Sequence, residues 1–190
     1  MNPVVEECIR LLRRDHIKVV AFDMDQTAVA MLSRGRLRRN DLQFYISKAS
    51  PAFSELIPAL FDYGFGLAIA THSDEAEFSG DVKRETHILG SELAKALVDT
   101  TFSALIARSF FIVAYNPRWH FDGMEENKKI KRHHMEEIKS HFGVDAKEIL
   151  FFDDTEIVVE DCNKTCGVRT IAVDPSEAFQ LSDLLNGLIR

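Results

Sequence analysis

Short apolar runs alternate with segments of helical spacing along most of the chain. Five runs have the length and composition of strands covered on both faces, and the segments between them repeat apolar residues every three to four positions. The predicted strands are residues 17–22, 65–70, 110–115, 148–152 and 169–173. The predicted helices are residues 3–14, 51–63, 91–108, 124–142 and 155–166, with a last helix that reaches Leu188.

This alternation predicts an α/β fold, in which a five-stranded and mainly parallel sheet lies between two helical layers, as in Rossmann-like three-layer αβα proteins. The last helix is introduced by Asp174-Pro175-Ser176-Glu177, which offers an N-cap, a proline at the first helical position and an acid three residues after the cap. No repeat, low-complexity tract or linker interrupts the pattern, so we expect a single domain over residues 1–190.

Charge and composition narrow the class of protein. The net charge of -7 argues against general nucleic-acid binding. No apolar stretch approaches about 18 residues, and the first residues do not resemble a secretory signal, so we expect no membrane span and a cytoplasmic location. Cys8, Cys162 and Cys166 show no CxxC spacing, which fits a reducing compartment. We expect Cys162 and Cys166 to pack as small apolar residues rather than bind zinc.

Polar side chains follow three of the predicted strands. The first strand is followed by Asp23-Met24-Asp25-Gln26-Thr27, the second by Thr71-His72-Ser73 and the fourth by Asp153-Asp154. Because the carboxyl ends of parallel strands lie along one edge, four carboxylates would gather there. Asp23 and Asp25 are two residues apart on extended chain and can face one ligand, one as a carboxylate and the other carrying a proton.

Carboxylates crowded at one edge need a cation or protons to offset their charge. Oxygen-only ligands favour a hard ion such as Mg²⁺, which leaves coordination positions for water and phosphate oxygens. Phosphoryl transfer also needs donors for the equatorial oxygens, and Thr71 with one of Lys128, Lys129 and Lys131 can supply them. The sequence therefore predicts metal-assisted phosphoryl chemistry at this edge.

In order and strand context, these residues resemble the four motifs of the haloacid dehalogenase superfamily of aspartate-nucleophile phosphohydrolases. The resemblance covers about residues 17–173. Within it, Lys131-Arg132-His133-His134 and Phe151-Phe152-Asp153-Asp154 are similar to the Lys-x-x-His and Phe-Phe-Asp-Asp elements of the small magnesium-dependent phosphatases. That similarity singles out Lys131 among the three lysines.

The resemblance implies a role for each carboxylate. Asp23 would attack phosphorus and become an aspartyl phosphate, while Asp25 would protonate the leaving oxygen and then activate the hydrolytic water. Mg²⁺ would be held by the Asp23 carboxylate, the Asp25 backbone carbonyl and the acidic pair, with Asp154 the favoured direct ligand and Asp153 close by. The resemblance thus implies a Mg²⁺-dependent phosphatase that acts on a phosphorylated substrate.

The other motif residues are implied to support the substrate and the loop. Thr71 and Lys131 would bind the phosphoryl oxygens, and Thr27 would brace the loop after the first strand. His72 stands where related proteins carry Arg, and it either contacts substrate or shapes its loop. After the acidic pair, that branch has an Asn a few residues on, whereas this chain reads Thr155-Glu156-Ile157. Because of this departure, a second interpretation is that the protein is a catalytically silent scaffold that binds a phosphorylated partner.

Several residues have a second interpretation. Lys131 can instead be an exposed helix lysine, and Thr155 is expected to be a helix cap rather than a ligand. His133 and His134 lie in a charged helix and are expected at the surface or behind the ligands. A receiver-type signalling domain uses similar groups, but the order of the motifs here is wrong for it.

Cap domains in this superfamily are inserted after the first motif or the third strand, and residues 28–50 and 116–124 leave no room for one. We therefore expect no cap domain and an open site, which by resemblance suggests a macromolecular phosphoester, such as a phosphoprotein, or a lid from another subunit. The loop that contains Arg34, Gly35, Arg36, Arg38 and Arg39 can approach an anionic substrate, and the alternative is a solvated basic loop.

Overall fold

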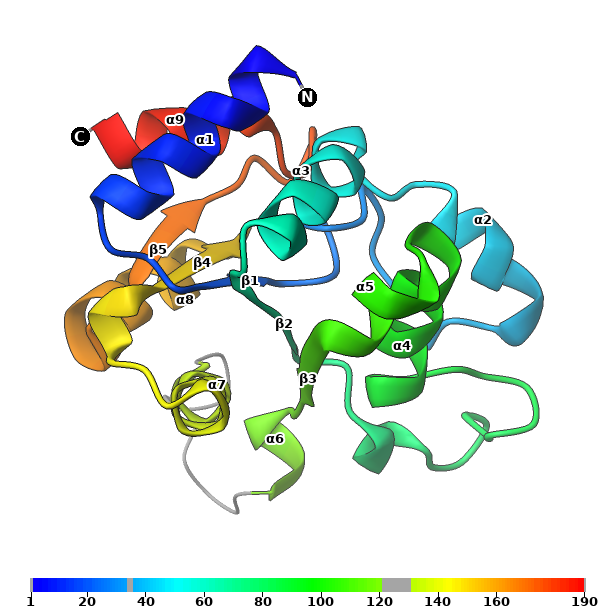
Figure 1. The fold of residues 1–190 in the computed structure, drawn as a ribbon. Helices are drawn as coiled ribbons and strands as arrows, with labels where there is room; N and C mark the ends of the chain where they lie inside the picture. Colours follow the sequence, from blue (N-terminus) through cyan, green and yellow to red (C-terminus); the bar gives the residue numbers. More distant parts are fainter. Residues whose placement is uncertain (1, 34–35, 121–130, 190) are drawn as a thin grey trace.

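The computed structural model describes residues 2–33, 36–120 and 131–189. Its centre is a five-stranded parallel sheet with the strand order β3-β2-β1-β4-β5 (Figure 1). The strands are β1 (Val19–Phe22), β2 (Gly66–Thr71), β3 (Phe110–Ala114), β4 (Ile149–Asp153) and β5 (Arg169–Ala172). All five predicted strands are present, and the predicted α/β fold is confirmed.

Helices cover both faces of the sheet. They are α1 (Pro3–Arg14), α2 (Leu42–Ile46), α3 (Pro51–Asp62), α4 (Gly90–Thr101), α5 (Ala104–Ser109), α6 (Pro117–His120), α7 (Arg132–Phe142), α8 (Glu156–Asp161) and α9 (Leu181–Ile189). Val20 and Phe22 of β1 pack in the core formed with α1, α3, α4 and α9, whereas Val19 and Ala21 pack in the core formed with α7 and α8. Burial on both faces explains why β1 is apolar at every position.

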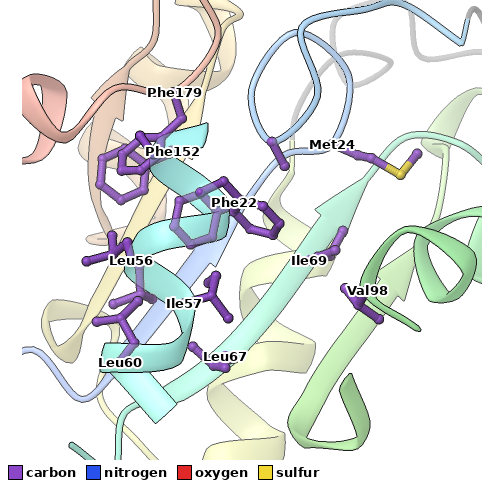
Figure 2. Packing of buried hydrophobic residues seen from close by; sticks show 14 of the residues in the cluster. Phe22, Met24, Leu56, Ile57, Leu60, Leu67, Ile69, Val98, Phe152 and Phe179 are labelled. Carbon is purple, nitrogen blue, oxygen red and sulfur yellow. The ribbon is translucent and has the colours of Figure 1, made fainter. Parts of the chain in front are cut away.

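Phe22, the last residue of β1, lies at the centre of a cluster of aromatic rings. Its ring centroid is 5.1 Å from those of Phe53 and Phe152 and 5.2 Å from that of Phe179. Figure 2 shows this packing, with the rings gathered where the strand ends. The cluster fixes the end of β1 immediately before Asp23.

The predicted helix over residues 91–108 is in fact two helices, α4 and α5. Phe102 has an extended conformation, with φ −123° and ψ 165°, and this ends α4. Its ring centroid lies 5.4 Å from that of Phe53 and 5.9 Å from that of Phe110. Packing of this partly buried ring against the core outweighs the hydrogen bonds of a continuous helix, which local spacing alone could not reveal.

The predicted helix over residues 155–166 consists of α8 followed by a π-helical turn, Cys162–Cys166. Cys162 is buried in the core, and Cys166 packs against it, as expected for small apolar side chains. The predicted helix over residues 124–142 begins at Arg132 in the described chain, and residues 124–130 lie outside the described residues.

The last helix, α9, begins later than predicted. Asp174 caps only a turn, and Ala178 has a left-handed φ of +57° that interrupts the helical chain. Phe179 then buries its ring beside Phe152, with centroids 4.8 Å apart, and its backbone N–H donates to the Thr27 carbonyl at 2.9 Å. Packing of Phe179 in the core therefore overrides the capping sequence.

The connections that follow β1 and β3 are short, as expected. Residues 23–50 contain a 3₁₀ turn (Arg39–Asp41) and α2, and the described residues after β3 contain α6. Within the described ranges no cap domain is inserted at either place. The described helices are also too short or too polar to span a membrane.

Candidate active site

The carboxyl ends of β1, β2 and β4 meet at a pocket of about 460 Å³. The pocket is lined by the predicted site residues Asp23, Asp25, Thr71, His72, Lys131, Asp153 and Asp154. Thr27 lies behind it, fully buried, and its Oγ1 finds no hydrogen-bond partner among the described residues. The Thr27 hydroxyl therefore makes no hydrogen bond to a described residue, although its backbone carbonyl accepts the Phe179 N–H. Lys128 and Lys129 lie outside the described residues.

The loop after β1 folds back on itself and presents two carboxylates to the pocket. Ala28 donates its backbone N–H to the Asp23 carbonyl at 3.2 Å, and Gln26 has the left-handed φ of +56° that the reversal requires. Met24 is fully buried, whereas Asp23 and Asp25 line the pocket. The alternation predicted for this segment is therefore present.

Lys131 is a buried cation at the base of the pocket, with a relative exposure of 2%. Its ammonium group donates to Asp23 Oδ1 and to the Ala70 carbonyl (2.7 Å), and lies 2.9 Å from Asp153 Oδ2. Burial alone would lower the pKa of Lys131, but the carboxylates of Asp153 and Asp23 raise it. The alternative of an exposed helix lysine is therefore wrong.

The buried carboxylates outnumber this cation. Burial raises the pKa of Asp23 to about 8, although Lys131 lowers it and Asp153 adds to the rise. Burial, followed by repulsion from Asp153, also raises the pKa of Asp154. Asp153 Oδ1 accepts the Thr155 N–H at 2.9 Å, whereas its Oδ2 accepts no well-aligned hydrogen bond from the described residues. The site carries more negative charge than Lys131 offsets.

This imbalance and the donor type suit a hard divalent cation, because carboxylate and carbonyl oxygens are its preferred ligands. Within the described ranges, no three side chains of metal-binding type lie close enough together to hold an ion as they stand. Lys131 contacts both Asp23 and Asp153. The fit therefore rests on the excess of buried carboxylates and on the incompletely satisfied Asp153 Oδ2.

Asp25 is held by two residues that the sequence did not indicate. Ser33 donates both its backbone N–H (2.8 Å) and its hydroxyl (2.6 Å) to Asp25 Oδ2. Tyr45 of α2 donates its hydroxyl to Asp25 Oδ1 at 2.5 Å. Burial, followed by the nearby charge of Asp25, raises the pKa of Tyr45 well above its ordinary value, so the phenol remains a donor at neutral pH. The Asp25 carboxylate therefore has one fixed orientation.

The N-cap and first turn of α7 are joined to the end of β2 by two side chains. Lys131 bonds the Ala70 carbonyl, and three residues later the His134 Nε2 pairs with the Thr71 carbonyl at 2.9 Å. Burial, followed by the charge of Lys131, lowers the pKa of His134 well below its ordinary value, so the neutral ring donates Nε2–H. His134 is thus behind the site, as expected, and His133 is exposed. The Lys-x-x-His spacing places both donors on one helix face.

Thr71 and His72 lie at the end of β2 and at the wall of the pocket. Thr71 Oγ1 accepts the Ser73 N–H at 3.2 Å, which leaves its hydroxyl hydrogen able to donate to a ligand. The His72 ring centroid is 5.4 Å from that of His134. Thr155 occupies the N-cap position of α8 as expected, but its side chain makes no capping hydrogen bond.

The arginine loop makes two different kinds of contact. Arg39 forms a two-point ion pair with Glu92 at 2.9 Å and also donates to the Arg84 carbonyl, so it holds two loops together. Arg38 lines a separate hollow, and Arg36 lines the pocket. Arg34 and Gly35 lie outside the described residues. Among the described arginines of this loop, only Arg36 remains a candidate to contact substrate.

Taken together, these features define an α/β protein with a buried lysine and clustered aspartates at the carboxyl ends of its central strands. No family model and no curated protein sequence matches the chain. Solved structures do match it in fold. A phosphatase domain from Bacteroides fragilis, solved in complex with Mg, has a TM-score of 0.56 and 14% identity over 97% of this chain and 45% of that chain.

Two further structures match over most of both chains. A haloacid dehalogenase-like family hydrolase from Streptococcus pneumoniae has a TM-score of 0.52 and 16% identity, over 90% of this chain and 91% of that chain. A phosphoserine phosphohydrolase-like protein from Francisella tularensis has a TM-score of 0.53 and 13% identity, over 92% of this chain and 100% of that one. The chain therefore has the fold of the haloacid dehalogenase-like hydrolases.

Proposed function

We propose that this protein is a metal-dependent phosphatase that hydrolyses a phosphomonoester through an aspartyl phosphate on Asp23, within a single hydrolase domain over residues 1–190. The observation that carries the proposal is the buried Lys131, which bonds Asp23 and Ala70 and pairs with Asp153 at the base of the pocket. Carboxylates that were merely solvated at a sheet edge would not require a buried cation between them.

Each polar group has a step in this proposal. A carboxylate oxygen of Asp23 attacks phosphorus while the bond to the leaving oxygen breaks, and Asp25 gives its proton to that oxygen. Asp25 then takes a proton from the water that attacks the phosphorus of the aspartyl phosphate, and the bond from phosphorus to Asp23 breaks. Lys131 and the Thr71 hydroxyl stabilise the equatorial oxygens, and His72 contacts the substrate from the pocket wall.

The metal ion in this proposal is Mg²⁺, and the residues that would hold it are Asp23, Asp153, Asp154 and the backbone carbonyl of Asp25. When bound, it supplies positive charge that offsets the carboxylates and the phosphoryl oxygens. The excess of buried carboxylates supports a divalent ion, and the similar domain from Bacteroides fragilis was solved with Mg.

Mg²⁺ is expected to raise the thermal unfolding temperature more at about pH 8.5 than at about pH 5.5. The pKa of Asp23 is raised from its ordinary value of 3.8 to about 8 in the folded protein. The stability of the metal-free protein therefore falls as the pH rises from the ordinary pKa of an aspartate toward 8, because only the folded state keeps this proton. Binding at 100 times the dissociation constant adds about 2.7 kcal/mol. Thermal melts with Mg²⁺ or EDTA measure this, with K⁺ at equal ionic strength as control. Equal shifts at both pH values, or a full shift in Asp154→Asn, would contradict the assignment.

Phosphate release from p-nitrophenyl phosphate tests the function directly. The wild-type protein should release phosphate with Mg²⁺, lose this activity in EDTA and regain it with excess Mg²⁺. The pocket volume is in the range of small-molecule sites, so a small phosphomonoester is the favoured substrate and a phosphoprotein is the alternative. If no phosphate is released between about pH 5 and 9, the catalytically silent scaffold is supported instead.

Tyr45→Phe is expected to lower kcat/KM about tenfold or more for an alkyl phosphate such as β-glycerophosphate, and much less for p-nitrophenyl phosphate. The Tyr45 hydroxyl orients Asp25, and an alkoxide leaving group needs proton transfer from Asp25 more than p-nitrophenolate does. Steady-state kinetics with both substrates measure the difference. Tyr63→Phe, at a half-exposed tyrosine, is the control. Equal losses on the two substrates would mean that Tyr45 serves only the fold.

A further inference from the structure

Two guanidinium groups line the pocket and have no acidic partner among the described residues. Arg36 lies in the loop after β1, and Arg118 lies in α6. Among the described residues, no carboxylate forms an ion pair with either of them. Arg39 and Arg84, in neighbouring loops, are instead paired with glutamates at 2.9 and 2.7 Å. The two pocket arginines are therefore available to an anionic ligand.

The two arginines follow different strands of the sheet. In the strand order, β1 and β3 lie on either side of β2, so the elements that carry Arg36 and Arg118 leave from both sides of the strand that ends in Thr71 (Figure 1). Lys131, the remaining Lys or Arg side chain at the pocket, is bonded to Asp23 and paired with Asp153. Unlike Lys131, the two arginines therefore form no ion pair with the aspartates of the proposed reaction.

The segment that carries Arg118 is held firmly in place. Asp74 Oδ2 accepts the Asn116 N–H and bonds the His120 Nε2, both at 2.7 Å. Glu77 accepts hydrogen bonds from the Asn116 and Trp119 side chains. These contacts fix both ends of α6, so Arg118 projects from a positioned element rather than from a free loop.

Two large apolar side chains border the same pocket. Leu32 is 44% exposed and Trp119 is 48% exposed, and both line it. Side chains of this size at the wall of a polar pocket offer a surface for the carbon skeleton of a leaving group. A substrate that contacts them lies in the same pocket as the two arginines.

We propose that Arg36 and Arg118 form a subsite for a second anionic group on the leaving group, so that the preferred substrates are phosphomonoesters with a further phosphate or carboxylate. The inference rests on the phosphatase function proposed above. Guanidinium groups suit both anions because they donate two hydrogen bonds in a fixed geometry. Trp119 and Leu32 pack against the apolar body that joins the two anionic groups.

Three substrates with one ring test the subsite. Phenyl phosphate, 4-carboxyphenyl phosphate and 1,4-phenylene bisphosphate share the reacting group and differ in the second anion. With the wild-type protein and Mg²⁺ at low ionic strength, kcat/KM for at least one doubly anionic substrate should exceed that for phenyl phosphate about tenfold. The doubly anionic substrate with the higher kcat/KM shows whether the subsite prefers a carboxylate or a phosphate as the second anionic group.

The variants are Arg36→Ala, Arg118→Ala and the double variant, with Arg38→Ala as the control. Arg38 belongs to the same loop but lines a separate hollow, so its substitution should leave the preference and the activity unchanged. Each single pocket variant should lower the preference for the doubly anionic substrate. In the double variant, the kcat/KM values for this substrate and for phenyl phosphate should be about equal. Thermal melts check that each variant is folded.

The outcomes separate the two proposals. Turnover of all three substrates without a preference, or a preference that survives in the folded double variant, would overturn the subsite and leave the phosphatase function standing. Absence of turnover with all three would overturn the phosphatase function and the subsite with it. A preference that falls equally in Arg38→Ala would show a general charge effect and would also overturn the subsite.

Discussion

Asp23→Asn is expected to abolish phosphate release, with a loss of about 10³-fold or more in kcat. The amide keeps the size of the carboxylate, so the pocket keeps its shape, but it is a far weaker nucleophile and cannot form the aspartyl phosphate. The amide can still accept a hydrogen bond from Lys131. Release of phosphate from p-nitrophenyl phosphate with Mg²⁺, followed with time, measures the loss.

Asp99→Asn is the matched control for this variant. Asp99 pairs with Lys95 on the exposed face of α4 at 2.7 Å, so its replacement should leave kcat unchanged. Acid quenching of the wild-type protein during turnover should also trap a phosphorylated chain, and Asp23→Asn should trap none. Undiminished turnover in the folded Asp23→Asn variant would exclude Asp23 as the nucleophile.

The pocket residues were predictable because the sequence patterns that place them are local. Asp23 directly follows β1, Thr71 and Asp153 end β2 and β4, and parallel topology brings strand ends to one edge whatever the detailed packing. Lys131 was singled out from Lys128 and Lys129 only by the resemblance of Lys131-Arg132-His133-His134 to the Lys-x-x-His element, and in the structure Lys131 and His134 both bond carbonyls at the end of β2. Topology therefore sufficed for the strand-end residues, whereas Lys131 was chosen through the resemblance to the Lys-x-x-His element.

The supports of Asp25 could not be predicted in this way. Tyr45 lies twenty residues beyond Asp25, in a five-residue helix, and Ser33 lies in an irregular loop. Neither residue belongs to a periodic pattern, and their contact with Asp25 depends on how residues 28–50 fold over the strand ends. The same limit applies to Phe179, whose ring decides the start of α9 through contacts with β1 and β4.

The arginine loop shows why composition is a poor guide to a binding surface. Four arginines between residues 34 and 39 suggested a common role, yet Arg39 is used by Glu92 and Arg38 faces another hollow. Glu92 is distant in sequence and lies in α4, so the pairing is visible only once α4 and the loop after β1 are placed. Arg118, which the sequence did not indicate, lines the pocket with Arg36.

Lys131→Met is expected to lower the unfolding free energy of the metal-free protein by about 3–5 kcal/mol, because it leaves Asp23 and Asp153 buried without their cation. It should also lower kcat about 10²-fold or more, since the ammonium no longer stabilises the phosphoryl oxygens. Chemical denaturation and steady-state kinetics measure the two effects. The matched control is Lys139→Met on the same helix, where a surface pair with Glu136 contributes at most about 1 kcal/mol.

The pH dependence and a double variant distinguish this loss from a simple packing defect. Without Lys131, the pKa of the buried Asp23 rises further, so the stability difference from wild type should widen as the pH rises above about 8, where Asp23 ionises in the folded wild type but not in the folded variant. A packing defect would be independent of pH. Asp23→Asn in the Lys131→Met background removes one of the uncompensated charges and should restore part of the lost stability, whereas additive losses in the two variants would show that the ion pair contributes nothing to the fold.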